Sequence, residues 1–173
     1  AVLEALTAQL ARSEPVAYVT DLHDGGGRLE PAQAHPDSFR NDQSGVAADG
    51  RTFIAIHNPP LKLAIVGGVH IAQYLTAMAQ ACGYEVTVID PRPAFASPAR
   101  FPDVKLLDDW PDDALDQIGV DMRTAVVTLT HDPKLDDPAI MAALRSDAFY
   151  LGALGSTRTH TKRCARLADV GYD

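Results

Sequence analysis

Two polar segments in the second half of the chain begin where an apolar run ends. Residues 130–138 read THDPKLDDP after the apolar run 124–129, and residues 152–160 read GALGSTRTH after residues 149–151. In open α/β sheets, ligands bind where such loops leave the carboxyl ends of parallel strands. We therefore expect these two loops to form a binding site. Their candidate residues are Thr130, His131, Asp132, Gly152, Gly155, Ser156, Arg158 and His160.

A glycine turn earlier in the chain is the third candidate loop. Residues 67–72 read GGVHIA after the apolar run 63–66, and residues 90–92 read DPR after the next one. Amides in such a turn can bind a phosphate, an acid at the next strand's end can hold a ribose hydroxyl, and an arginine beside it can reach a phosphate. Val69 stands where the dinucleotide fingerprint has glycine, so the pattern indicates a Rossmann-type fold more than bound NAD. The candidates here are Gly67, Gly68, His70, Asp90 and Arg92.

Several of these polar residues also have a purely structural interpretation. Arg158 and His160 fall in the first turn of a predicted helix, where cations oppose the helix dipole. This placement indicates either an anionic ligand or an exposed basic face. Asp136 and Asp137 are typical of a turn and a helix start, with Asp137 as the N-cap and Pro138 in the first helical position.

The sequence offers no constellation for covalent or metal chemistry. His131 and Asp132 are neighbours, but adjacency does not let them bond as in a catalytic triad, and no serine or cysteine elbow accompanies them. The six histidines and two cysteines lack HxxxH or CxxC spacing. We therefore assign no catalytic residue and no metal ligand, and expect a binding protein rather than a turnover enzyme.

Composition limits the partners and the compartment. The 173 residues include 15 Lys and Arg against 23 Asp and Glu, a net charge of −8 that repels nucleic acid and anionic lipid. No apolar run is long enough to span a bilayer, and residues 1–12 lack the basic start of a signal peptide. Cys82 and Cys164 lie far apart in helical patterns, which is no disulfide framework, so we expect a cytoplasmic protein.

Residues 1–60 are expected to form a small N-terminal α+β arm. The apolar spacing predicts a helix over 2–12 and strands over 16–20 and 52–56, separated by a Gly-, Asp- and Pro-rich interval, 21–50, that is a poor core former. The HNPP segment at 57–60 marks the boundary with the next domain.

Residues 61–173 alternate regularly between strand and helix patterns. Strands are predicted over 63–66, 85–89, 104–107, 125–129 and 149–151, and helices over 70–82, 112–118, 138–144 and 157–168. In the first of these helices, Ile71, Leu75, Met78 and Ala79 share the face expected to pack on the sheet. The alternation predicts an α/β, Rossmann-like, doubly wound parallel sheet with strand order 3-2-1-4-5.

Several motifs of this second part also occur, in the same order, in one known family. They are VGGVHIA at 66–72, VIDPR at 88–92, Phe95, RFP at 100–102, WP at 110–111, LTHDPKLD at 129–136, YLGALGS at 150–156, and then Arg158, Thr159, His160 and Arg163. With these motifs, the chain from about residue 59 to residue 173 resembles the Rossmann-type C-terminal domain of the XdhC/CoxI family. Its members are accessory proteins of xanthine dehydrogenase and related molybdenum hydroxylases.

The resemblance implies a protein that binds the molybdenum cofactor, helps to keep it sulfurated and protected, and inserts it into a hydroxylase apoenzyme. That cofactor is a pterin with a phosphate and, in some bacteria, a nucleotide. The implied partners are the hydroxylase, a cysteine desulfurase and a second copy of the chain. The family's Gly-Gly-Cys motif is not recognisable in residues 1–60, and the chain stops where members normally continue, so we expect a C-terminally truncated domain.

Two other functions stay open from the residues alone. The glycine turn and Asp90 are compatible with an oxidoreductase that uses NAD(P) as its cofactor. The valine in that turn is also compatible with an interaction domain whose nucleotide crevice is vestigial.

Overall fold

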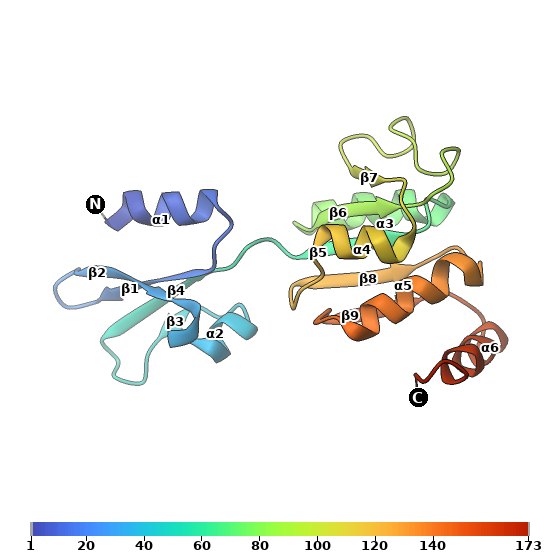
Figure 1. Cartoon of the computed structure of the whole chain (residues 1–173). Coiled ribbons are helices and arrows are strands. Elements are labelled where there is room, and N and C mark those ends of the chain that lie inside the picture. Colours follow the sequence, from blue (N-terminus) through green and yellow to red (C-terminus); the bar gives the residue numbers. More distant parts are fainter. Residues whose placement is uncertain (1, 173) are drawn as a thin grey trace. The chain divides into compact units, whose positions relative to one another are not determined.

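The computed structural model describes residues 2–172. The chain divides into two compact units, with the boundary along the sequence between Pro60 and Leu61 (Figure 1). Among these residues, no helix is long and apolar enough to cross a membrane. Each unit has its own sheet and its own buried cluster of side chains.

The first unit contains a four-stranded antiparallel sheet with strand order β2-β1-β4-β3. Its elements are α1 (Val2–Ala11), β1 (Val16–Asp21), β2 (Gly27–Pro31), a 3-10 turn (Ala32–Ala34), α2 (Pro36–Arg40), β3 (Gly45–Val46) and β4 (Thr52–His57). Ala17, Val19 and Phe39 form its buried core.

The interval 21–50, expected to contribute little to a core, supplies part of this one. It provides strand β2, which pairs with β1 by backbone hydrogen bonds that need no apolar side chain, and helix α2. Pro36 occupies the first turn of α2, where its missing amide proton is no loss, and the helix places Phe39 in the core. One aromatic residue in a polar interval is therefore enough to anchor it.

The second unit contains a five-stranded parallel sheet with strand order β7-β6-β5-β8-β9, which confirms the predicted order 3-2-1-4-5 and the Rossmann-like class. Its elements are β5 (Lys62–Val66), α3 (His70–Ala81), β6 (Glu85–Ile89), β7 (Lys105–Leu107), α4 (Pro111–Ile118), β8 (Thr124–Thr128), α5 (Pro133–Arg145), β9 (Tyr150–Ala153) and α6 (Thr157–Ala168).

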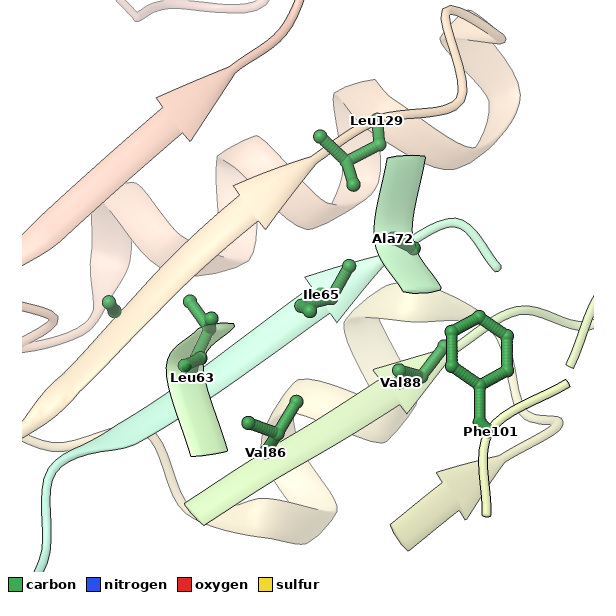
Figure 2. Close-up of a cluster of buried hydrophobic side chains, with 9 residues drawn as sticks. Leu63, Ile65, Ala72, Val86, Val88, Phe101 and Leu129 are labelled. Atoms are coloured by element: carbon green, nitrogen blue, oxygen red, sulfur yellow. The ribbon is translucent and has the colours of Figure 1, made fainter. Parts of the chain in front are cut away.

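Side chains alternate between two core clusters, one on each face of this sheet. Leu63 and Ile65 of β5 pack with Val86 and Val88 of β6 and with Phe101 on the face that α3 covers (Figure 2). Ala64 and Val66 of β5 and Ile89 of β6 belong to the other cluster, together with residues of α4 and α5. These two helices lie on the other face of the sheet from α3 (Figure 1). Burial on both faces explains why the strands read as continuous apolar runs.

Helix α3 packs on the sheet through a face that overlaps only in part with the one expected. Ala72, Thr76 and Ala79 are its buried residues, whereas Ile71 and Met78 are 49% and 60% exposed. Small side chains let the helix lie close to strands that are already crowded with branched residues. The prediction was right for Ala79, which is buried, and for Leu75, which packs against the core, and wrong for the exposed Ile71 and Met78.

Helix α5 begins five residues earlier than expected, at Pro133 rather than Pro138. Asp132 is its N-cap, with a side chain that accepts a hydrogen bond from the Lys134 amide at 3.0 Å, and Asp137 is not a cap. This segment has two Asp-Pro pairs, at 132–133 and 137–138, and burial of Leu135 favours the earlier one as the helix start.

Candidate functional site

The turns that leave the carboxyl ends of β5 and β8 are in direct contact. Gly67 has a φ of +108°, and a Cβ built there would lie 2.5 Å from Cγ2 of Thr130. Glycine is therefore required at this position both by its backbone conformation and by the close approach of the neighbouring loop. The glycine turn and the THD loop meet at the same edge of the sheet.

Asp90, at the end of β6, is fully buried and its carboxylate accepts four hydrogen bonds. The Gly68 amide and Nη2 of Arg92 donate to Oδ2 at 2.9 and 2.8 Å, and the amide and Nε of Arg92 donate to Oδ1 at 3.0 and 2.8 Å. Burial alone raises the pKa of Asp90, but the bonds from Arg92 and Gly68 outweigh it and leave the pKa below its usual value. The carboxylate is ionised and its acceptor sites are filled.

The glycine turn is covered by the segment that follows β6. A Cβ on Gly68 would lie 2.6 Å from the carbonyl oxygen of Phe95. Nη1 of Arg100 donates at 2.6 Å to the carbonyl oxygens of both Gly68 and Phe95, and the Arg92 guanidinium carbon lies 4.0 Å from the centre of the Phe95 ring. The turn that a dinucleotide would approach is therefore packed against the chain itself.

The loop between β8 and α5 is fixed by Asp136, which is 1% exposed. Its Oδ1 accepts from the Thr130 hydroxyl at 2.7 Å, and its Oδ2 accepts from the His131 amide at 3.1 Å. His131 itself has a left-handed backbone with a φ of +62°, which is uncommon outside glycine. Asp136 thus stabilises a strained turn that presents an exposed histidine at the edge of the sheet.

Arg163, from the middle of α6, joins this loop to the one after β9. Its guanidinium is buried; Nη2 lies 3.5 Å from Oδ2 of Asp136 and donates to the Leu154 carbonyl oxygen at 3.0 Å, and Nη1 donates to that of Ala153 at 3.4 Å. Its Nε has no hydrogen-bond partner among residues 2–172. Buried polar groups are normally paired, so this donor is an exception among the hydrogen bonds of the loop.

A cavity of about 270 Å³ lies between the β8–α5 loop and α6. Its lining residues are His131, Pro133, Asp136, Arg158, Thr159, Lys162, Arg163 and Arg166. Arg166 pairs with Asp137 at 2.6 and 2.8 Å. In the described part of the chain, neither Arg158 nor Lys162 has a carboxylate partner. We call this hollow the α6 cavity; its surplus positive charge suits an anion.

The start of α6 strengthens this preference. The Ser156 hydroxyl oxygen accepts from the Thr159 amide at 3.2 Å and so caps the helix. The amides of the first helical turn have no acceptor within the helix, and the helix dipole places partial positive charge there. An anion near Arg158 would interact favourably with the free amides and with this partial positive charge.

Two of the thirteen predicted site residues line the α6 cavity: His131 and Arg158. Thr130, Asp132, Gly155 and Ser156 belong to the same two loops and shape them without lining the cavity. Gly67, Gly68, Asp90 and Arg92 form the separate, closed arrangement around the first turn.

The three remaining predicted residues lie outside both arrangements. His70 is exposed, with its ring edge-on to Tyr74 at 5.2 Å between centroids. His160 is also exposed, and its Nε2 lies 3.5 Å from Sγ of Cys164. Gly152 lies within β9 beneath the side chain of Tyr150.

Sequence reasoning missed several residues of the cavity as site residues. These are Pro133, Asp136, Thr159, Lys162, Arg163 and Arg166. The cations were visible in the sequence, because positions 158, 162, 163 and 166 recur on one face of a helix. Asp136 could not be recognised as a site residue in the sequence, because its interpretation as a turn residue depended on the wrong helix start.

A larger cavity, of about 410 Å³, lies at the opposite edge of the sheet. Its charged lining residues, Lys62, Glu85, Asp103 and Lys105, are of both signs. Ligands of open α/β sheets bind at the carboxyl edge, so the smaller α6 cavity is the candidate site despite its size. Within residues 2–172, no group of three or more metal-ligating side chains comes together.

Comparison with known proteins relates the second unit to one family. The family model described as the XdhC Rossmann domain matches residues 63–173. The molybdenum cofactor insertion chaperone PaoD of Escherichia coli K12 is 35% identical over 114 residues, which cover 66% of this chain and 30% of that protein. This chain therefore spans less than a third of the curated relative.

The fold has a counterpart among solved structures. A protein described as a xanthine dehydrogenase from Bacillus halodurans matches 93% of this chain and 54% of its own chain, with a TM-score of 0.72 and 21% identity. At that level of identity the likeness shows a shared fold.

Proposed function

Because the chain belongs to the XdhC family, we propose that it is an accessory protein of a molybdenum hydroxylase of the xanthine dehydrogenase type. In this proposal it binds the molybdenum cofactor, protects it and passes it to the apoenzyme. The cofactor is cargo, so the residues of this chain bind and orient it rather than catalyse a reaction. The relative PaoD is named a molybdenum cofactor insertion chaperone, which supports this assignment.

The observation behind the proposal is the cationic α6 cavity at the carboxyl edge of the sheet. The pterin of the cofactor carries a phosphate, and Arg158 and Lys162 offer two cations without carboxylate partners in the described residues. The buried guanidinium of Arg163 also lines the cavity. A phosphate is bound most strongly by such charge-assisted hydrogen bonds.

The remaining candidates surround this cavity, and we propose that they contact the rest of the cofactor. His131 lies exposed on its strained turn, within reach of any group that extends from the cavity. Thr130, Asp132, Gly155 and Ser156 fix the two loops that frame it. Asp90 and Arg92 hold the first turn closed.

The proposal extends to the partners of the chain and to its compartment. We propose that the chain takes part in sulfuration of the cofactor together with a cysteine desulfurase, and that it acts as a homodimer. We also propose the cytoplasm as its compartment, because Cys82 and Cys164 are free, exposed thiols, which a reducing environment preserves.

The nicotinamide alternative has less support from the geometry. A ribose hydroxyl needs a free acceptor on the acid after the second strand. Asp90 has all its acceptor sites filled by Arg92 and Gly68, and Phe95 covers the glycine turn. The vestigial-crevice alternative agrees with that closed turn, but leaves the cationic cavity without a role.

The proposal is tested by anaerobic incubation of the protein with molybdenum cofactor, followed by removal of free cofactor and fluorescence detection of the oxidised pterin that is retained. The expected result is stoichiometric retention by the wild type and reduced retention by Arg158→Gln. Titration with NADH and NADPH in the same buffer tests the alternative. Absence of pterin retention by a folded protein would refute the proposed function.

A further inference from the structure

Exposed residues of helix α3 form an apolar face, and we infer that two copies of this chain associate through it. The inference gives an interface to the homodimer of the proposed function, and it depends on no bound ligand. We call this surface the α3 face; it consists of Ile71, Tyr74, Ala77, Met78, Ala81 and the C-cap residue Cys82, all exposed.

Helix α3 differs from the other α-helices of residues 2–172 in that it contains no Asp, Glu, Lys or Arg. A surface helix normally turns charged residues to water, and a helix that is apolar on all sides is normally buried. The inner side of α3 already packs on the sheet through Ala72, Thr76 and Ala79. Its outer side is nevertheless apolar, with Tyr74 and Met78 each 60% exposed.

The two glutamines of α3 lie beside this face and contact another segment of the same unit. Nε2 of Gln73 donates to the carbonyl oxygen of Arg100 at 3.1 Å, and Nε2 of Gln80 donates to that of Asp103 at 3.4 Å. The polar side chains of the helix are thus directed to the segment that follows β6. The face that remains is dominated by an aromatic residue and a methionine, types that are enriched at protein interfaces.

The α3 face is complementary in shape to a second copy of itself. Residues four positions apart form rows along a helix. Tyr74, Met78 and Cys82 form a raised row, and Ala77 and Ala81 form a low row beside it. Packing such a ridge into such a groove is the commonest class of helix contact, and a two-fold axis lets each copy insert its ridge into the groove of the other.

Charge favours a second copy at this face. The chain has a net charge of −8, so two copies repel each other over most approaches. The α3 face lets them meet without placing like charges opposite each other. It also offers no counter-charge to a partner that binds through charged residues.

The extent of the face sets the expected strength of the dimer. A pair of crossing helices is smaller than the standard protein interface of about 1,600 Å². We therefore expect a dimer that dissociates in the micromolar range. Because added salt screens the repulsion between the two negative copies, association should strengthen as the salt concentration rises.

The test is sedimentation velocity of the full chain over a range of micromolar concentrations, with a reductant present so that Cys82 forms no disulfide. We expect a dimer that forms with increasing concentration in the wild type, and at least about ten-fold weaker dimerisation in Met78→Glu, because like charges then face each other. Met122→Glu is the matched control: Met122 is 74% exposed in the turn before β8, outside the α3 face, and gains the same charge.

A second variant tests the groove without adding a charge. Ala77→Gln places a longer, neutral side chain in the low row and should also weaken dimerisation, because it obstructs the ridge of the partner. Glutamine is a good helix former, so the exposed substitution should leave the monomer folded. Far-UV circular dichroism of each variant checks this.

The outcomes separate this inference from cofactor binding. A wild type that stays monomeric at all concentrations, or equal weakening by Met78→Glu and Met122→Glu, overturns the α3 face as the interface. Dimers that Ala77→Gln leaves unchanged overturn the ridge-and-groove contact. A monomeric wild type that retains the cofactor overturns the interface and leaves cofactor binding standing. A dimer that Met78→Glu dissociates, in a protein that does not retain the cofactor, supports the interface and removes the proposed cofactor binding.

Discussion

Gly67 and Thr130 lie so close that the space for a side chain on the glycine is filled by the methyl group of the threonine. This contact joins the turn after the first strand of the parallel sheet to the loop that leads to the α6 cavity. It makes the position of the β8–α5 loop depend on a residue more than sixty positions earlier in the chain.

Replacing Gly67 with alanine is expected to destabilise the second unit by about 2–4 kcal/mol, because strain at a left-handed φ adds to a steric clash. Gly83→Ala is the control: its φ is +83° but nothing lies within 4 Å of the added Cβ, so strain of about 1–2 kcal/mol is the expected cost. Denaturant unfolding followed by Trp110, the single tryptophan and a residue of this unit, measures both. Equal losses would show that Thr130 yields to the added methyl group.

The two ion pairs between α6 and α5 are expected to differ strongly in their contribution. Arg163 and Asp136 are both buried, so Arg163→Leu leaves a buried carboxylate with fewer donors and should destabilise the unit by about 3 kcal/mol. The Arg166 side chain is 40% exposed, and Arg166→Leu should cost at most about 1 kcal/mol. The same unfolding measurement tests this. A larger loss for Arg166→Leu than for Arg163→Leu contradicts the assignment of Arg163 as the structural link.

In the first unit, Asp49 is expected to titrate far below an ordinary aspartate. The Thr52 hydroxyl donates to it at 2.6 Å, and the amides of Arg51 and Thr52 donate at 2.8 and 2.9 Å, which lowers its pKa to about 2. A depressed folded-state pKa means that the carboxylate stabilises the unit above the unfolded value, near 3.8, and that this contribution is lost as the pH falls toward 2.

Carboxyl NMR titration of the wild type and of Thr52→Val tests this expectation. Removal of the hydroxyl should move the pKa of Asp49 upward, while the two amide bonds keep it below the usual value. An Asp49 pKa that does not respond to Thr52→Val would show that the amides alone are responsible.

The parallel sheet could be predicted from the sequence because each of its strands is a short apolar run followed by turn residues. Strand order then followed from the alternation of strands and helices. The buried face of α3 could be predicted only in part, since Ala79 is buried as expected but Ala72 and Thr76 take the places expected for the larger Ile71 and Met78. Periodicity identifies the helix, but close packing decides which face is buried.

The sequence predicts those parts of the candidate site whose residues lie close together along the chain. The loops with His131 and Arg158 followed from their place after apolar runs. The pairing of Asp136 with Arg163, 27 positions apart, depends on how α6 returns to α5, and no local pattern contains it. Asp90 and Arg92 are only two positions apart, but the sequence could not show that the guanidinium would bond back to the carboxylate and not reach a ligand.

The start of α5 gives the last prediction, because its two prolines should respond in opposite directions. Pro133 occupies the first helical position, where a missing amide proton costs nothing, so Pro133→Ala should lower stability by about 0.4–1 kcal/mol by adding freedom to the unfolded chain. Pro138 lies inside the helix and cannot donate to the carbonyl oxygen four residues earlier, at Lys134.

Pro138→Ala should therefore raise the free energy of unfolding by about 1–2 kcal/mol, the gain of a helical hydrogen bond less the entropy released in the unfolded chain. Denaturant unfolding followed by Trp110 compares the two variants under identical conditions. A helix that began at Pro138 would change the sign for that residue, with Pro138→Ala lowering stability. The pair of measurements thus decides between the two Asp-Pro helix starts that the sequence offers, and with them the placement of Asp136 beside the α6 cavity.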